Sequence, residues 1–201
     1  EDGIVLKNCG FSFNNCRRRN YKREEGGVMV KQISATIKVE VTESDDAKHR
    51  YVLYKEWDKD KPTCTIITLF PGSAELVITD TTQMLITNHL YRLGYGAFYS
   101  VNLFSKVGIA ARGQKVFANA TNKVNDENIL ACAEKSKIVI LAWGCLPDKN
   151  KIVKQRVEAI LSKMSPYSGK CFYLSNVQDD KHCHPLSNKV KCEWNLVVDK
   201  E

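Results

Sequence analysis

Apolar and polar residues alternate over the first regular part of the chain. Residues 33–41 place isoleucine, alanine or valine at every second position, and the alternation resumes over residues 51–55 after the polar segment 43–48. A period of two is typical of a strand with one exposed face, and two such strands around a short polar segment form an antiparallel hairpin. We therefore expect an N-terminal antiparallel hairpin at the edge of a sheet.

Further along the chain, short apolar runs alternate with longer segments of helical periodicity. Residues 63–70, 97–104, 138–143 and 170–174 predict buried strands, and residues 79–93, 125–135 and 149–163 predict helices. Asp80 and Gln83 have the spacing of a capping box at the start of the first helix. Strands that alternate with helices favour right-handed crossovers. The sequence thus predicts an α/β protein, a three-layer α/β/α sandwich with a mainly parallel central sheet.

The chain of 201 residues is long enough for one domain with its own core. Residues 1–31 are irregular and basic, so we expect a flexible N-terminal arm there and a single α/β domain over residues 32–201. No apolar run is long enough to span a bilayer, and the N-terminus lacks the apolar core of a signal peptide. We therefore expect a cytoplasmic protein with no membrane partner.

The formal net charge is +7, and basic residues gather at positions 17–23 and 149–154. Lysine and arginine that face phosphates release condensed counterions, so this balance favours a phosphate-bearing partner such as DNA or a nucleotide. A surface kept soluble by charge explains the same composition. In the arm, the basic run is either a nucleic-acid contact that becomes ordered on binding or a flexible terminus.

Eight cysteines are present, but the chain is too long and too evenly patterned for a secreted disulfide scaffold, so we expect reduced thiols. His182, His184 and Cys192 are residue types that bind zinc, yet the second half of this group offers one cysteine where structural zinc sites present a pair. We expect no metal and no cofactor; a metal-dependent hydrolase built on these three residues is the alternative. No glycine-rich phosphate loop of the Walker or dinucleotide type is present.

Candidate site residues follow the expected strands at their carboxyl ends, where ligands bind in open α/β sheets. They are Phe70, Pro71, Gly72 and Ser73 after the first strand, Asn102 and Phe104 at the second, Trp143 and Gly144 at the third, and His184 in a later turn. The long segment 105–124 carries Arg112, which either closes over an anion or belongs to a solvated loop. Structural roles are the alternatives: Trp143 in the core, His184 capping a carbonyl, and Asn102 satisfying backbone groups.

These residues belong to a longer series of blocks. In chain order the eight blocks are Arg50-Tyr51-Val52-Leu53-Tyr54-Lys55-Glu56-Trp57, Thr68-Leu69-Phe70-Pro71-Gly72-Ser73-Ala74-Glu75, Asp80-Thr81-Thr82, Gly94-Tyr95-Gly96, Val101-Asn102-Leu103-Phe104, Asn125-Asp126, Ala142-Trp143-Gly144 and His184-Pro185-Leu186. In order and spacing the series resembles the bacterial and phage family catalogued as domain of unknown function 1643, over about residues 48–198. The resemblance implies a fold more firmly than a reaction.

The arrangement is more distantly similar to the uracil-DNA glycosylase superfamily. In that superfamily the turn after the first core strand positions water, a buried asparagine reads a base edge, and a histidine stabilises the oxyanion of the departing base. The counterparts in this chain are Pro71, Asn102, Trp143, Gly144, His184 and Pro185. The resemblance implies a uracil-DNA glycosylase-like fold and a pocket for a base extruded from the stack.

One position departs from both patterns. Phe70 stands where the two families place asparagine or aspartate before proline, and a phenyl ring neither holds nor activates water, although it can stack on a base. Glu75 and Asp80 are the carboxylates that can substitute, unless Asp80 is only a helix cap. We therefore expect a nucleic-acid-directed or nucleotide-directed protein with a base-recognising pocket. It is either a DNA glycosylase-like hydrolase acting on a modified base or a non-catalytic binding module.

Overall fold

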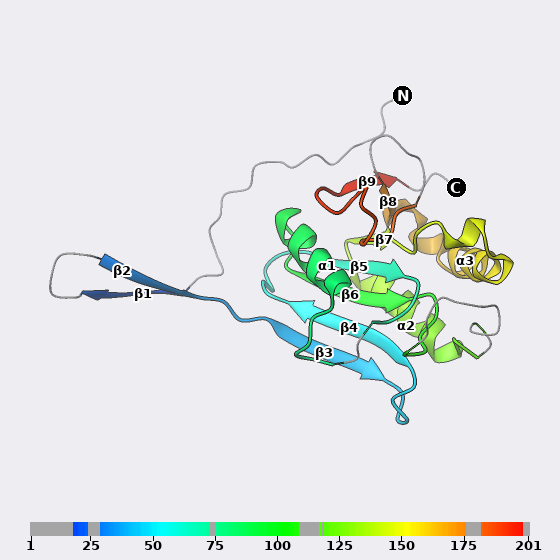
Figure 1. Ribbon diagram of the computed structural model, residues 1–201, viewed down its shortest axis with the longest axis horizontal. Coiled ribbons are helices and arrows are strands. Elements are labelled where there is room, and N and C mark those ends of the chain that lie inside the picture. Colours follow the sequence, from blue (N-terminus) through cyan, green and yellow to red (C-terminus); the bar gives the residue numbers. More distant parts are fainter. Residues whose placement is uncertain are drawn as a thin grey trace.

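The computed structural model describes residues 18–23, 29–72, 75–108, 117, 119–175 and 182–198, with side chains from residue 32 onward. Within these residues the chain forms a seven-stranded sheet with helices and, apart from it, a two-stranded hairpin (Figure 1). The strand order of the large sheet is β3-β4-β6-β5-β7-β8-β9. The predicted α/β class is therefore confirmed.

The strands are β1 (Arg18–Arg23), β2 (Met29–Ser34), β3 (Lys38–Glu43), β4 (Arg50–Glu56), β5 (Thr63–Thr68), β6 (Ala97–Asn102), β7 (Ile138–Leu141), β8 (Cys171–Ser175) and β9 (Asn195–Val198). The α-helices are α1 (Thr81–Arg92), α2 (Lys123–Lys135) and α3 (Lys151–Lys163), and two short 3₁₀ turns, η2 (Leu146–Asp148) and η3 (Ser165–Lys170), flank α3. None of the helices in the described part of the chain is long and apolar enough to cross a membrane.

The sheet is mixed, so the prediction of a mainly parallel sheet is wrong. Strands β6, β5, β7 and β8 pair in parallel, whereas β3–β4, β4–β6 and β8–β9 pair antiparallel. With β1–β2 added, four of the seven strand pairings within the described residues are antiparallel. The error arose because a strand buried on both faces has the same apolar pattern in either direction, and because β9 was not predicted as a strand.

The predicted edge hairpin is confirmed as β3 and β4, with β3 at one edge of the sheet. The alternating stretch 33–41 is divided, however, because its first two residues belong to β2, which pairs with β1. Strand β1 and part of β2 occupy the range predicted as a flexible arm, and residues 1–17 and 24–28 of that range lie outside the described residues.

The core has two hydrophobic clusters, one on each face of the sheet. Ile67 in β5 packs with residues of α2 and α3, including Ile129 and Ile160, whereas its neighbour Ile66 packs with Ile86 and Leu90 of α1. Consecutive residues of a strand point to opposite faces, so helices contribute to the core on both sides of the sheet. The uracil-DNA glycosylase-like description of this three-layer arrangement stays a prediction.

Candidate functional site

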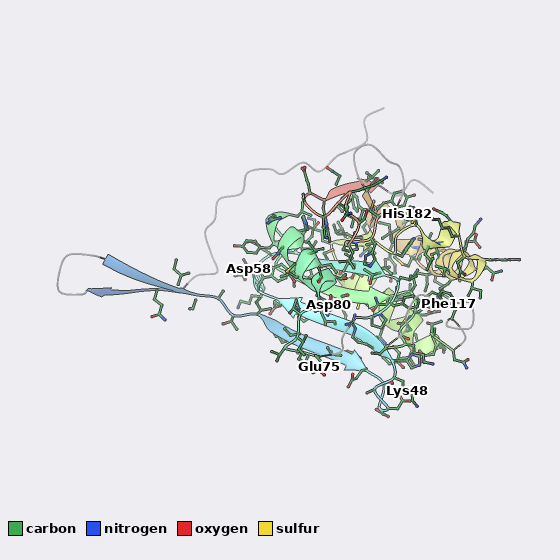
Figure 2. All side chains as sticks on the ribbon, viewed as in Figure 1. Lys48, Asp58, Glu75, Asp80, Phe117 and His182 are labelled. Atoms are coloured by element: carbon green, nitrogen blue, oxygen red, sulfur yellow. The ribbon has the colours of Figure 1, made fainter. Side chains whose placement is uncertain are left out.

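Five polar side chains from distant parts of the chain lie around the start of α1. Asn102 ends β6 and His184 lies against Gly144 after β7, whereas Lys55 is paired with Phe98 near the amino end of β6 and reaches Thr79 through its side chain. We call Arg50, Lys55, Asp80, Asn102 and His184 the Asp80 cluster. Asp80 lies at the N-terminal end of α1 (Figure 2). Strands β5 and β7 are adjacent and parallel, but their outgoing helices α1 and α3 pack on opposite faces of the sheet. Such a reversal is where open α/β sheets bind ligands.

Asp80 caps α1, and its side chain lies against Gly72. Its Oδ1 accepts the backbone N–H of Gln83 at 2.8 Å, so the predicted helix start is confirmed. Its Oδ2 lies so close to Gly72 that a Cβ on that residue would be 2.1 Å away. Any larger residue at position 72 therefore has to displace the carboxylate.

Two cations of β4 are buried beside this carboxylate. Arg50 is 2% exposed and Lys55 is 5% exposed. The Nζ of Lys55 donates to the Oγ1 of Thr79, the residue before Asp80, at 3.1 Å. Burial lowers the pKa of Arg50 to about 10 and also lowers the pKa of Lys55, and in both cases the Asp80 charge opposes the shift. Burying a charged side chain costs free energy, so the burial of both Arg50 and Lys55 near Asp80 points to a functional role for this pair.

His184 lies against a second glycine, Gly144, which follows β7. Gly144 has a φ of +79°, and a Cβ there would lie 3.2 Å from the Cβ of His184. The Nδ1 of His184 accepts the backbone N–H of Leu186 at 3.2 Å, which leaves the ring proton of the neutral form on Nε2. Burial lowers the pKa of His184 and the Asp80 charge partly offsets it, so the imidazole is neutral at pH 7.

Asn102 is 1% exposed, and both ends of its amide have partners. Its Nδ2 donates to Thr68 Oγ1 at 2.6 Å, and its Oδ1 accepts from Arg50 Nη2 at 3.3 Å. The amide therefore positions Arg50. In this arrangement Asn102 is occupied within the protein, which does not suit the predicted role of reading a base edge.

The end of β6 is held from the opposite face by α2 and α3. Asn125 Nδ2 donates to the carbonyl oxygens of Asn102 and Leu103 at 3.0 and 3.3 Å, and Arg156 Nε donates to that of Leu103 at 2.8 Å. Asp126 pairs with Arg156, with 2.5 Å between Oδ1 and Nη2. These bonds fix the backbone from which Asn102 reaches Arg50.

The aromatic candidates pack in the hydrophobic cluster that includes residues of α2 and α3. The ring of Phe70 packs against Phe104 and Phe117, with centroids 5.4 and 5.8 Å apart, and Phe104 is 2% exposed. Trp143 is 3% exposed and belongs to the same hydrophobic cluster. Phe104 and Trp143 are thus core residues, and Phe70 is half-buried against them.

The other candidates are dispersed. Glu75 is exposed and lies beyond Asp80 on the side of β3 (Figure 2). Pro71 is buried, and Ser73 and Arg112 lie outside the described residues. His182 stacks on Tyr173 with ring centroids 4.0 Å apart. Among the described residues, no three histidine, cysteine, aspartate or glutamate side chains are grouped so as to hold a metal ion.

Arg50 and Lys55 were missed as site residues from the sequence. Lys55 gave one signal, because it occupies the position of Leu53 in the alternation of β4, which faces the core. Arg50 begins the first of the sequence blocks, but its burial was not predicted, since a charged residue at the start of a strand is ordinarily on the surface.

The comparison with protein families gives a match over most of the chain. The family model described as "Protein of unknown function (DUF1643)" matches residues 50–186, a range that contains the whole Asp80 cluster. Neither a curated protein nor a solved structure matches the chain. The resemblance expected from the sequence blocks is thereby confirmed. Because the match covers more than half of the 201 residues, the chain belongs to the DUF1643 family.

Proposed function

We propose that the chain binds a nucleotide, free or within a nucleic acid, at the Asp80 cluster and hydrolyses its N-glycosidic bond. One observation carries the proposal: two buried cations, Arg50 and Lys55, and a histidine lie close enough to the Asp80 carboxylate at the start of α1 to feel its charge. Perturbed, buried titratable groups concentrated in one place are typical of functional sites.

The cations suit a phosphate. Arg50 and Lys55 place two positive charges near the carboxylate of Asp80, and burial strengthens their attraction for an anion because the local dielectric is low. The N-terminal end of α1 adds the positive end of its dipole at the same place. A phosphate or phosphodiester would be attracted by both cations and by the helix end.

Asp80 and His184 suit glycosidic cleavage. As the base departs, positive charge develops on the sugar, and the Asp80 carboxylate stabilises it, holds the attacking water and accepts the proton that the water loses when its oxygen bonds to the sugar carbon. The departing base takes the bonding electron pair, and the neutral His184 donates a hydrogen bond from Nε2–H to the resulting anion. In this proposal Asp80 takes the role of the residue that Phe70 replaces, on a three-layer fold like that of the uracil-DNA glycosylases.

A non-catalytic binding module is the second candidate, and one observation favours it. The position before Pro71 is a phenyl ring that packs with Phe104 and Phe117, so the side chain at that position does not hold water. In that case Arg50 and Lys55 bind the same ligand without turnover.

The test is base release from nucleotides and from DNA that carries a range of modified bases. We expect release by the native chain and a loss of about 10²-fold to 10³-fold in Asp80→Asn and His184→Gln, with affinity retained. Lys55→Met should abolish binding, whereas Lys137→Met, an exposed lysine at the amino end of β7, should not. Binding that depends on Lys55 but comes without release favours the module. Neither binding nor release from any substrate would overturn the proposal.

A further inference from the structure

The hairpin β1–β2 extends away from the seven-stranded sheet (Figure 1). Its strands pair antiparallel over six residues each, from Arg18 opposite Ser34 to Arg23 opposite Met29. The three side chains of β2 that the structure describes, at positions 32–34, are all exposed, including the apolar Ile33. An isolated two-stranded hairpin is at best marginally stable in water, so a partner that covers it would add to its stability.

The strands of this hairpin are basic. Five of their twelve residues are basic and none is acidic; the five are Arg18, Arg19, Lys22, Arg23 and Lys31. The segment that connects the strands contains Glu24 and Glu25, so residues 18–34 carry five positive and two negative formal charges. Neighbouring like charges on paired strands repel each other. A polyanion removes that repulsion.

The register distributes the basic positions over both faces. Positions 19, 23 and 31 share one face with Tyr21, and positions 18 and 22 share the other with Asn20 and Gln32. An element basic on both faces does not suit a flat anionic surface, which neutralises one face only. It suits a groove with phosphates on both sides.

We propose that β1–β2 is a ribbon that enters the major groove of duplex DNA. That groove is about 12 Å wide and admits a two-stranded ribbon. Six residues at about 3.4 Å each give a ribbon roughly 20 Å long, which can lie along the groove beside several successive phosphates. The inference goes beyond the proposed function and does not depend on the Asp80 cluster. It names double-stranded DNA as the partner, and the pocket can fail without affecting it.

The test measures affinity for a short DNA duplex in a salt series of about 50–200 mM, with the full chain. The variant Arg19→Gln/Arg23→Gln/Lys31→Gln removes the three cations of one face. We expect its logarithmic salt dependence to fall by up to about 2.7, since each phosphate contact contributes roughly 0.9, and its low-salt affinity to fall more than about tenfold. The matched control Lys149→Gln/Lys151→Gln/Lys154→Gln removes three exposed lysines around the start of α3 and should change neither.

Two further arms make the result decisive. The charge-retaining variant Arg19→Lys/Arg23→Lys/Lys31→Arg should keep the native salt dependence, which separates lost charge from a lost hairpin. Binding of a free nucleotide should be the same in the native chain and the glutamine variant, which separates the ribbon from the pocket. Equal salt dependence for the glutamine variant and the native chain, or tighter binding of single strands than of duplex, would overturn the inference.

Discussion

Gly72→Ala tests whether the Asp80 carboxylate is held against the turn that follows β5. A Cβ at position 72 would lie 2.1 Å from Asp80 Oδ2, whereas non-bonded carbon and oxygen atoms approach to about 3.2 Å or more. The carboxylate must therefore retreat by roughly 1 Å. The cap bond from the backbone N–H of Gln83 to Oδ1, now 2.8 Å, would lengthen beyond hydrogen-bond distance.

The expected cost follows from the lost cap. Removing an N-cap hydrogen bond costs about 1 kcal/mol, within a range of about 0.5–2 kcal/mol. For a chain of this size that corresponds to a fall in melting temperature of about 2–4 °C per kcal/mol. We expect urea unfolding of Gly72→Ala to give a free energy of unfolding lower by about 1–2 kcal/mol, together with weaker ligand binding at the cluster.

Two comparisons decide the cause. Gly169→Ala is the matched control, because nothing lies within 4 Å of a Cβ at position 169, and it should change stability by less than about 0.5 kcal/mol. In an Asp80→Ala background the clash is absent, so Gly72→Ala should cost about 1 kcal/mol less than in the native chain. Equal costs in both backgrounds, or a cost equal to that of Gly169→Ala, would refute the reasoning.

Three other changes have clear expected outcomes. Lys55→Met should leave the free energy of unfolding unchanged or raise it by about 1–2 kcal/mol, because methionine keeps a similar shape and removes a buried charge. A decrease of more than about 2 kcal/mol in urea unfolding would mark Lys55 as structural. The lowered pKa of His184 means that the unfolded chain binds its proton first, so the stability of the native chain relative to His184→Gln should fall as pH drops below about 6.5; a flat difference in unfolding at several pH values would contradict this. Asp126→Asn should cost about 2–4 kcal/mol at pH 7, because it leaves Arg156 with 10% exposure short of its partner, whereas Glu127→Gln in an exposed pair should cost under about 0.5 kcal/mol. Burial raises the pKa of Asp126 but the bonds from its basic partners lower it more, so this cost should shrink below pH 4, as measured by unfolding at acid pH.

The parts predicted correctly are those with local causes. The hairpin of β3 and β4 follows from a period of two on either side of a polar turn, and the start of α1 follows from the spacing of Asp80 and Gln83. Each of these signals lies within a few residues of the element that it specifies. Strand direction is different, because it depends on how the chain runs between strands. Strand β9 pairs antiparallel with β8, and residues 182–194, the described part of their connection, contain no helix.

The parts that were missed have distant causes. Nothing near Arg50 in the sequence shows that its side chain is buried against Asn102, which is 52 positions away. In the same way, Asn102 ends a strand and looks available for a ligand, but the fold shows that its Nδ2–H donates to Thr68 Oγ1. A polar residue is therefore assigned to a site or to the scaffold by partners that only the fold brings near.

The hydrogen bonds on the other face of the sheet help to explain how two buried cations stay in place. Burial of Arg50 and Lys55 on one strand is costly, so the surrounding backbone must resist opening. Asn125 and Arg156 contribute to that resistance, because they bond to the carbonyls of Asn102 and Leu103. Arg156 and Lys163 both pair with Asp126, so one carboxylate holds this second network together. Opening the end of β6 would therefore break bonds on both faces of the sheet, including the one between Asn102 and Arg50.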